Sequence, residues 1–222
     1  MDGDRLTAAV ERYILSPDEK VIDRRDWPDS VAIKTNWGWY DAEPANWLVA
    51  REAWVEQAVR LVMDASIEDV PLSTFGLLLR HDREVLYLND QATMRGLGGR
   101  MGDDLDPIAY AELLAEFYSG PDIDRPVVAA DTVSDFTRPG WLVQDVDATL
   151  QEHPHLESAG LAPPRVTQTA QRVELSFHSC RYYLDSVGIK GSFDVLRWTV
   201  TGGAGQEVSW RREYVVKGVK RA

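Results

Sequence analysis

The sequence has one cysteine and no long apolar run. Cys180 stands alone among 222 residues, which excludes an internal disulfide and is typical of a reducing compartment. No stretch approaches the roughly 18 apolar residues that a membrane-spanning helix needs. The N-terminal residues carry neither a basic segment nor a long apolar one, so we predict no signal peptide. We therefore expect a soluble, cytoplasmic protein with no membrane partner.

The sequence also lacks the short motifs of common catalytic and cofactor sites. It has no Gly-x-Ser-x-Gly, HExxH or DxDxDG pattern. In the glycine-rich stretch 96–102, GLGGRMG, Met101 stands where a dinucleotide fingerprint needs glycine, and no P-loop lysine follows. We interpret this stretch as a surface loop and expect no cofactor. Whether the protein is an enzyme stays open, since catalytic groups are often assembled from distant segments.

Two histidine-containing segments are candidates for a metal site or a nucleophile. His178 and Cys180 share one face of an expected strand, but they are roughly 7 Å apart, and a zinc site usually has a second ligand pair. His153 and His155 lie near several carboxylates, in a stretch with the composition of an exposed loop. We expect a structural cysteine, polar surface histidines and no metal site.

The N-terminal part reads as mainly helical. A helical stripe is formed by Leu6, Val10, Tyr13 and Ile14. Residues 16–25 begin with Ser-Pro-Asp-Glu, a capping pattern that predicts a second, short helix. Residues 30–37 alternate weakly and predict a short strand. Apolar residues between 44 and 65 follow a 3.6-residue period, so we expect a central, largely buried helix there.

The middle of the chain alternates between strands and helices. Residues 74–90 predict a β-hairpin, since two arms rich in Leu, Val, Phe and Tyr flank a polar turn. Asp106 and Pro107 begin a further helix, and a short helix is expected at 145–152. The stretch 153–164, HPHLESAGLAPP, predicts a loop.

The last third predicts antiparallel strands. They are expected at residues 165–184, 193–201 and 206–217. The glycine-rich turn 201–206 joins the last two. Pairing Trp198 with Trp210 gives one apolar and one polar face, so we prefer this register to a slip that pairs Trp198 with Val208.

Together these elements predict an α+β fold. We expect an antiparallel, curved sheet in the C-terminal half, with helices from the N-terminal half packed on one face. A single domain is expected over residues 1–222. An internal boundary at 153–164 would separate an acidic helical part from a basic β part, because residues 1–164 carry a net charge of −17 and residues 165–222 carry +5.

Candidate ligand-binding residues lie in two places. Trp37 and Trp39 flank Gly38 and, with Tyr40, either pack on the core or line a cleft where an indole stacks on a ligand. Trp47 and Trp54 are assigned to the core of the expected helix at 44–65. On the polar side of the last strands lie Glu174, His178, Arg197 and Arg211. Such a face binds an anionic ligand or acidic peptide, or is an ordinary solvated surface.

These patterns favour a non-catalytic binding or protein-interaction protein, whose partner is an unknown protein or a small anionic ligand. The overall charge of −12 disfavours a dedicated nucleic-acid binder, because phosphate contacts need a basic footprint. The alternative is a small-molecule enzyme or ligand carrier with a pocket between the sheet and the helices.

Overall fold

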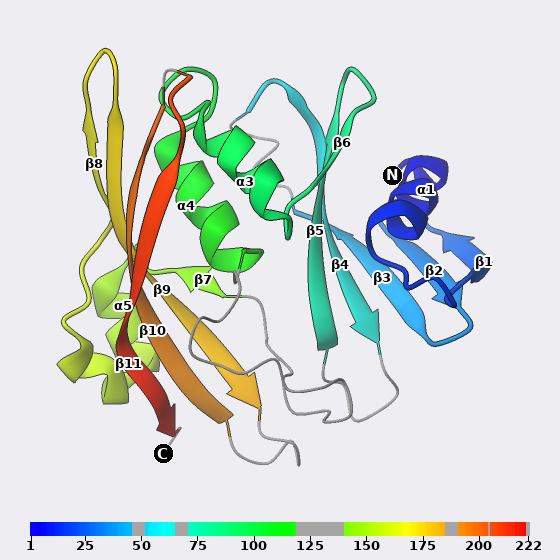
Figure 1. The fold of residues 1–222 in the computed structure, drawn as a ribbon. Helices are drawn as coiled ribbons and strands as arrows, with labels where there is room; N and C mark the ends of the chain where they lie inside the picture. Colours follow the sequence, from blue (N-terminus) through cyan, green and yellow to red (C-terminus); the bar gives the residue numbers. More distant parts are fainter. Residues whose placement is uncertain (46–51, 65–70, 119–139, 185–190, 204, 221–222) are drawn as a thin grey trace. The chain divides into compact units, whose positions relative to one another are not determined.

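The chain of this computed structural model forms two compact units, Met1–Asn89 and Asp90–Ala222 (Figure 1). The structure describes residues 1–45, 52–64, 71–118, 140–184, 191–203 and 205–220. Two antiparallel sheets and several helices confirm the mixed α+β class. The single domain, the internal boundary at 153–164, the curvature of the C-terminal sheet and the helices expected on it stay predictions.

The first unit is built on a six-stranded antiparallel meander, in which each strand pairs with the next along the chain. Its strands are β1 (Val21–Asp26), β2 (Val31–Thr35), β3 (Trp39–Pro44), β4 (Val55–Asp64), β5 (Pro71–Arg80) and β6 (Val85–Tyr87). The short strand predicted at 30–37 and the hairpin predicted at 74–90 are thereby confirmed.

Helix α1 (Gly3–Tyr13) covers one face of this sheet (Figure 1). Asp2 caps the helix by accepting a hydrogen bond from the backbone N–H of Arg5 at 3.2 Å. Leu6 and Val10 are fully buried, as the helical stripe predicts, and each contributes roughly 1.5–3 kcal/mol through burial. The sheet residues of the same core include Val31, Ile33, Tyr40, Ala42, Val59, Leu61, Leu77 and Leu79.

The helix predicted at 44–65 is wrong, because Val55–Asp64 forms the inner strand β4. Val59 is buried in the core beneath α1, whereas the neighbouring Ala58 is buried on the opposite face. A strand buried on both faces carries apolar residues at most positions, and such a run imitates a wide helical stripe. Pairing with β3 and β5 decides between the two. Trp47 lies outside the described residues.

The helix predicted at 16–25 is also wrong, because Val21–Asp26 forms the edge strand β1. Glu19, at the expected capping-box position, is buried instead. Its carboxylate accepts hydrogen bonds from the hydroxyls of Thr35, at 2.6 Å, and Tyr40, at 3.1 Å. This tertiary partnership replaces the local cap that the capping pattern suggests.

The second unit contains a sheet with the order β11-β10-β9-β7, and β8 also pairs with β9. Its strands are β7 (Trp141–Leu142), β8 (Arg165–Gln168), β9 (Val173–Leu184), β10 (Gly191–Gly202) and β11 (Ser209–Lys220). The single long strand expected at 165–184 is therefore a hairpin, with its turn at residues 169–172. The strands expected at 193–201 and 206–217 correspond to β10 and β11.

Four helical segments accompany this sheet: α3 (Gln91–Gly98), α4 (Pro107–Glu116), α5 (Val146–Glu152) and the 3₁₀ helix η1 (Pro154–Ala159). Asp106 caps α4, as the sequence predicts, and Asp145 caps α5, the short helix expected at 145–152. Helix α4 contacts β7 and β9 (Figure 1). On the apolar face of the sheet, Phe177 and Trp198 stack with ring centroids 5.6 Å apart. The stretch expected as a loop at 153–164 contains η1.

The predicted register of the last hairpin is wrong by two residues. Trp198 pairs with Arg212, and Val200 pairs with Trp210. Because the shift is even, Trp198 and Trp210 still share the apolar face. Val208 explains the shift: it precedes β11, is 2% exposed, and packs so closely that a Cβ on Gly202 would lie 2.6 Å from its Cγ2. The connection is therefore longer than expected.

The glycine-rich stretch 96–102 is only partly a loop, because Gly96–Gly98 complete α3. Gly98 permits a close approach, since a Cβ there would lie 2.7 Å from both the Tyr110 hydroxyl and Val208. The Tyr110 hydroxyl in turn donates a hydrogen bond to the backbone oxygen of Met94 at 2.8 Å. Gly98 therefore allows α3 to pack closely on Tyr110 and Val208. The glycine spacing of phosphate-binding loops gives no information about such packing.

Candidate functional site

Strands β8 to β11 bring polar side chains together on the sheet face opposite Trp198. Cross-strand partners share a face of an antiparallel sheet, so the pairings define two exposed rows. One row contains Arg165, Ser176, Thr199 and Arg211, and the next contains Thr167, Glu174, Thr201 and Ser209. Together with Arg172, Arg197 and Glu213, these eleven residues are here called the arginine face.

Two arginines of this face share one carboxylate. Arg197 contacts Glu213 at 2.6 Å, and Arg211 contacts the other oxygen of Glu213 at 2.7 Å. The hydrogen bond from Arg197 and the charge of Arg211 lower the pKa of Glu213. The side chain of Arg211 is 80% exposed, so its guanidinium is available to solvent and to a partner.

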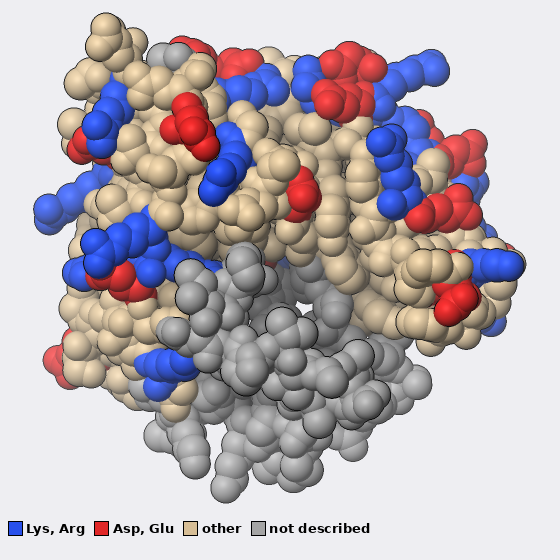
Figure 2. Space-filling view, in the orientation of Figure 1, with Lys and Arg blue, Asp and Glu red and all other residues tan. Residues whose placement is uncertain are grey.

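The other two arginines lie toward the β8–β9 hairpin. Arg172 forms an ion pair with Glu174 at 3.0 Å and lies 3.5 Å from the Thr201 hydroxyl. Arg165 is exposed. The face thus has four arginines and two glutamates, an excess of two positive charges, in a protein whose total charge is −12. Figure 2 shows lysine and arginine side chains gathered over the C-terminal strands, with acidic ones among them.

His178 is next to Arg197 in the ladder but does not belong to the exposed surface. It is 7% exposed, and its Nδ1 lies 3.3 Å from the backbone N and O of Ala162. Burial lowers the pKa of His178, and the charge of Arg197 lowers it further, against the opposing effect of the Ala162 contact. The imidazole is therefore a covered, neutral group at neutral pH.

Cys180 follows His178 on the same side of β9 but lies in an apolar cluster. The cluster contains Val143, Leu156, Ala159 and Val195, with η1 supplying two of its members. Burial raises the pKa of the Cys180 thiol to about 12. A thiol that stays protonated is a poor nucleophile, so this pair of residues supplies no thiolate chemistry.

The aromatic candidates of the first unit do not converge. Trp37, in the turn before β3, is 60% exposed, whereas Tyr40 is 3% exposed and faces the core beneath α1. Burial, followed by the nearby charge of Glu19, raises the pKa of Tyr40. Trp39 points to the opposite face, where Arg25 Cζ lies 4.8 Å from its ring centroid. A three-residue aromatic platform is therefore not formed.

Of the predicted residues, the structure groups Glu174, Arg197 and Arg211 on one exposed face. Sequence reasoning missed Arg165 and Arg172 because it read one strand where the chain forms a hairpin. The polar run TQTAQR, 167–172, was the available signal for that turn.

Neither a metal site nor a membrane-spanning helix is found in the described part of the chain. No group of three His, Cys, Asp or Glu side chains lies close enough there to bind a metal ion. None of the described helices has both the length and the apolarity needed to cross a membrane. No family model, curated protein or solved structure matched the chain in comparison.

Proposed function

We propose that the protein is a non-catalytic binding protein that recognises an acidic segment of another protein through the arginine face. The observation that carries the proposal is the excess of guanidinium groups over carboxylates on one exposed sheet surface. Guanidinium groups bind carboxylates through paired, charge-assisted hydrogen bonds. An acidic segment would complete the pairing that Glu174 and Glu213 begin.

The spacing of the face favours an extended partner. Arg165 and Arg211 stand in one row across four strands, so roughly 14 Å separates their backbones at about 4.8 Å per strand. Carboxylates four residues apart on an extended segment span a similar distance. Between the two arginines, Ser176 and Thr199 have short side chains that let a partner approach the sheet closely.

A nucleic-acid partner fits less well. The footprint carries an excess of only two positive charges on a chain of net charge −12, and long-range repulsion opposes a polyanion. An enzymatic role for this face lacks a suitable group, because His178 is covered and Cys180 is buried.

Fluorescence anisotropy with a labelled deca-glutamate peptide tests the proposal. The double variant Arg197→Gln/Arg211→Gln should weaken binding at least about tenfold, because each charge-assisted hydrogen bond contributes on the order of 1.5–3 kcal/mol. The matched control is Lys20→Gln/Arg25→Gln, which removes the same charge from exposed positions of the first unit. Equal weakening by both variants would show an effect of net charge alone and reject the proposal. Tighter binding of single-stranded DNA of equal charge, lost in the same variant, would replace the acidic protein with a nucleic acid.

A further inference from the structure

A cavity of about 360 Å³ lies within the first unit, between α1 and the turn that joins β5 to β6. Its lining residues are Arg5, Ala8, Ala9, Arg12, Tyr13, Arg83, Glu84 and Val85. The volume is within the range of small-molecule sites, which begins at roughly 300 Å³. The cavity is lined by residues of the first unit, whereas the residues of the arginine face all belong to the second unit.

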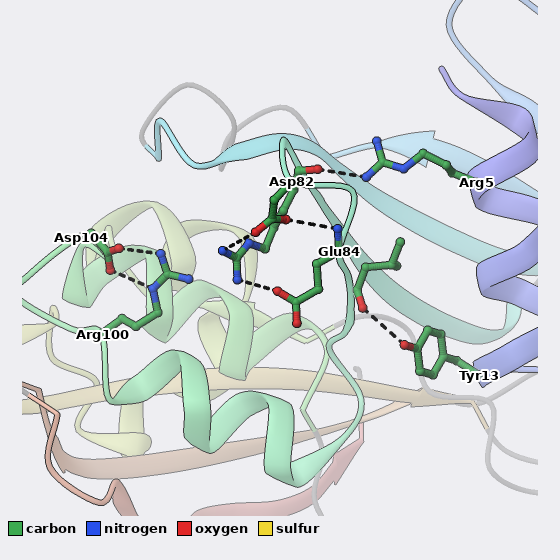
Figure 3. A network of polar contacts seen from close by, with 8 residues as sticks. Arg5, Tyr13, Asp82, Glu84, Arg100 and Asp104 are labelled. Atoms are coloured by element: carbon green, nitrogen blue, oxygen red, sulfur yellow. Dashed lines mark hydrogen bonds and ion pairs between the residues drawn. The ribbon is translucent and has the colours of Figure 1, made fainter.

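The side chains that line the cavity include more positive than negative charges. Three arginines line it, while its one carboxylate, Glu84, is held by Arg80 at 2.6 Å. Arg80 also pairs with Asp82 at 2.8 Å, so its guanidinium is shared by the two acidic side chains of the turn (Figure 3). Arg12 and Arg83 are exposed and therefore present their guanidinium groups to solvent. The lining has an excess of positive charge.

Arg5 is held in position at the wall. Its guanidinium contacts Glu56 at 2.7 Å and donates to the backbone oxygen of Arg80 at 3.0 Å. Its buried Nε has no hydrogen-bond partner among the residues that the structure describes. Buried donors are nearly always satisfied, so this Nε is a hydrogen-bond donor that the described residues leave unused.

Arg83 has an unusual backbone for its residue type. Its φ is 70°, in the left-handed region that favours glycine and asparagine. The turn itself is regular, since Arg83 N–H donates to Arg80 O at 3.0 Å and Arg80 N–H donates to Glu84 O at 2.9 Å. A turn selected for stability alone favours glycine here. Residues with a strained backbone are concentrated at binding sites, where their side chains contact the ligand.

The remaining wall is apolar and fixed. Ala8 and Ala9 leave room because their side chains end at Cβ, and Val85 closes the other side. The hydroxyl of Tyr13 donates to the backbone oxygen of Val85 at 3.4 Å (Figure 3). The ring of Tyr13 stacks on Tyr87 with centroids 5.8 Å apart. An occupant therefore meets guanidinium groups at one part of the wall and methyl and ring carbons at another.

We infer that this cavity binds a small organic anion, with one carboxylate or phosphate group held by Arg12 and Arg83 and an apolar body against Ala8, Ala9 and Tyr13. The chemistry shared by both head groups is an oxyanion that accepts several hydrogen bonds. The apolar wall requires a carbon skeleton as well, which distinguishes this ligand from a free inorganic ion.

Isothermal titration of the full chain with phenyl phosphate, benzoate and benzamide tests the inference. The two anions should bind saturably with one site, and the uncharged benzamide should not. The stronger of the two anions identifies the head group. Absence of saturable binding by both anions, or equal binding of benzamide, would overturn the inference.

Variants assign the binding to this cavity. Arg12→Gln/Arg83→Gly should weaken binding of the preferred anion at least about tenfold. Ala8→Leu should fill the apolar part of the cavity and weaken binding of the preferred aromatic anion. The matched control Lys20→Gln/Arg25→Gln removes two positive charges outside the cavity and should have little effect. Unchanged binding in the arginine variant, with the fold verified by circular dichroism, would refute the site. Binding of deca-glutamate serves as an independent readout, because it depends on the second unit.

Discussion

Replacing Arg83 with glycine should stabilise the protein and weaken anion binding at the same time. The left-handed backbone at φ 70° costs a residue with a Cβ roughly 1–2 kcal/mol. Glycine removes that cost but adds about 0.4–1 kcal/mol of unfolded-state entropy. The side chain is exposed, so little packing is lost. The expected gain in the free energy of unfolding is therefore about 0.5–1 kcal/mol.

The matched variant Arg83→Ala separates the two effects. Alanine removes the guanidinium but keeps the Cβ, so it should weaken anion binding as glycine does without stabilising the fold. Equilibrium urea unfolding, followed by tryptophan fluorescence, measures the stability of all three proteins. Titration with phenyl phosphate or benzoate measures binding.

Two results would refute the reasoning. A glycine variant no more stable than the alanine variant would show that the backbone at Arg83 is not strained. Full affinity in both variants would show that Arg83 takes no part in binding. The expected pattern is higher stability for glycine alone and equally reduced affinity for both.

Three further predictions concern the second unit. Burial lowers the pKa of His178, so the neutral imidazole contributes to stability above about pH 6.5, and this contribution is lost as the pH falls. The variant His178→Gln should therefore flatten this part of the pH dependence of the free energy of unfolding. Gly98→Ala should destabilise by about 1–3 kcal/mol through overpacking, whereas Gly96→Ala, in the same helix with open space around it, should stabilise by up to about 1 kcal/mol in urea unfolding. Cys180 should react with Ellman's reagent only after unfolding, and rapid reaction of the native protein would contradict its burial.

Local sequence patterns correctly predicted elements that are buried on one side and exposed to solvent on the other. Helix α1 has one buried stripe and one solvent-facing side, so its period is visible in the sequence. The cap at Asp106 is equally local, because its side chain accepts a hydrogen bond from a backbone N–H two residues later. These features do not depend on distant segments, which is why sequence reasoning found them.

Features that depend on distant partners were missed. Strand β4 has apolar residues on both faces, and only its pairing with β3 and β5 distinguishes it from a buried helix. The register of β10 and β11 depends on Val208, which packs near Gly98 more than a hundred residues away. No count of local propensities contains that contact. The predicted apolar and polar faces of β10 and β11 are nevertheless correct, because a register error of two residues leaves each side chain on the same face of the sheet.

The candidate sites follow the same division. Alternation alone placed Arg197 and Arg211 on one face, whereas the addition of Arg165 required the β8–β9 hairpin. The cavity between α1 and the β5–β6 turn is lined by Arg5 and Arg12, which are seven residues apart on one face of the helix. Its third arginine, Arg83, comes from a turn about seventy residues later in the chain. Net charge did not reveal this excess, because residues 1–164 together carry −17 and the three arginines come together only in the folded chain.

Net charge is therefore a weak guide to what this protein binds. Screening in physiological salt limits the reach of an exposed charge to about 8 Å, so a ligand responds to the groups beside it. A total charge of −12 repels polyanions at long range, while two local surfaces have an excess of guanidinium groups. Such a division favours small or short anionic partners over long ones, since a short partner meets the local excess without the distant repulsion. Both proposals, an acidic segment on the arginine face and a small organic anion in the cavity, satisfy that condition.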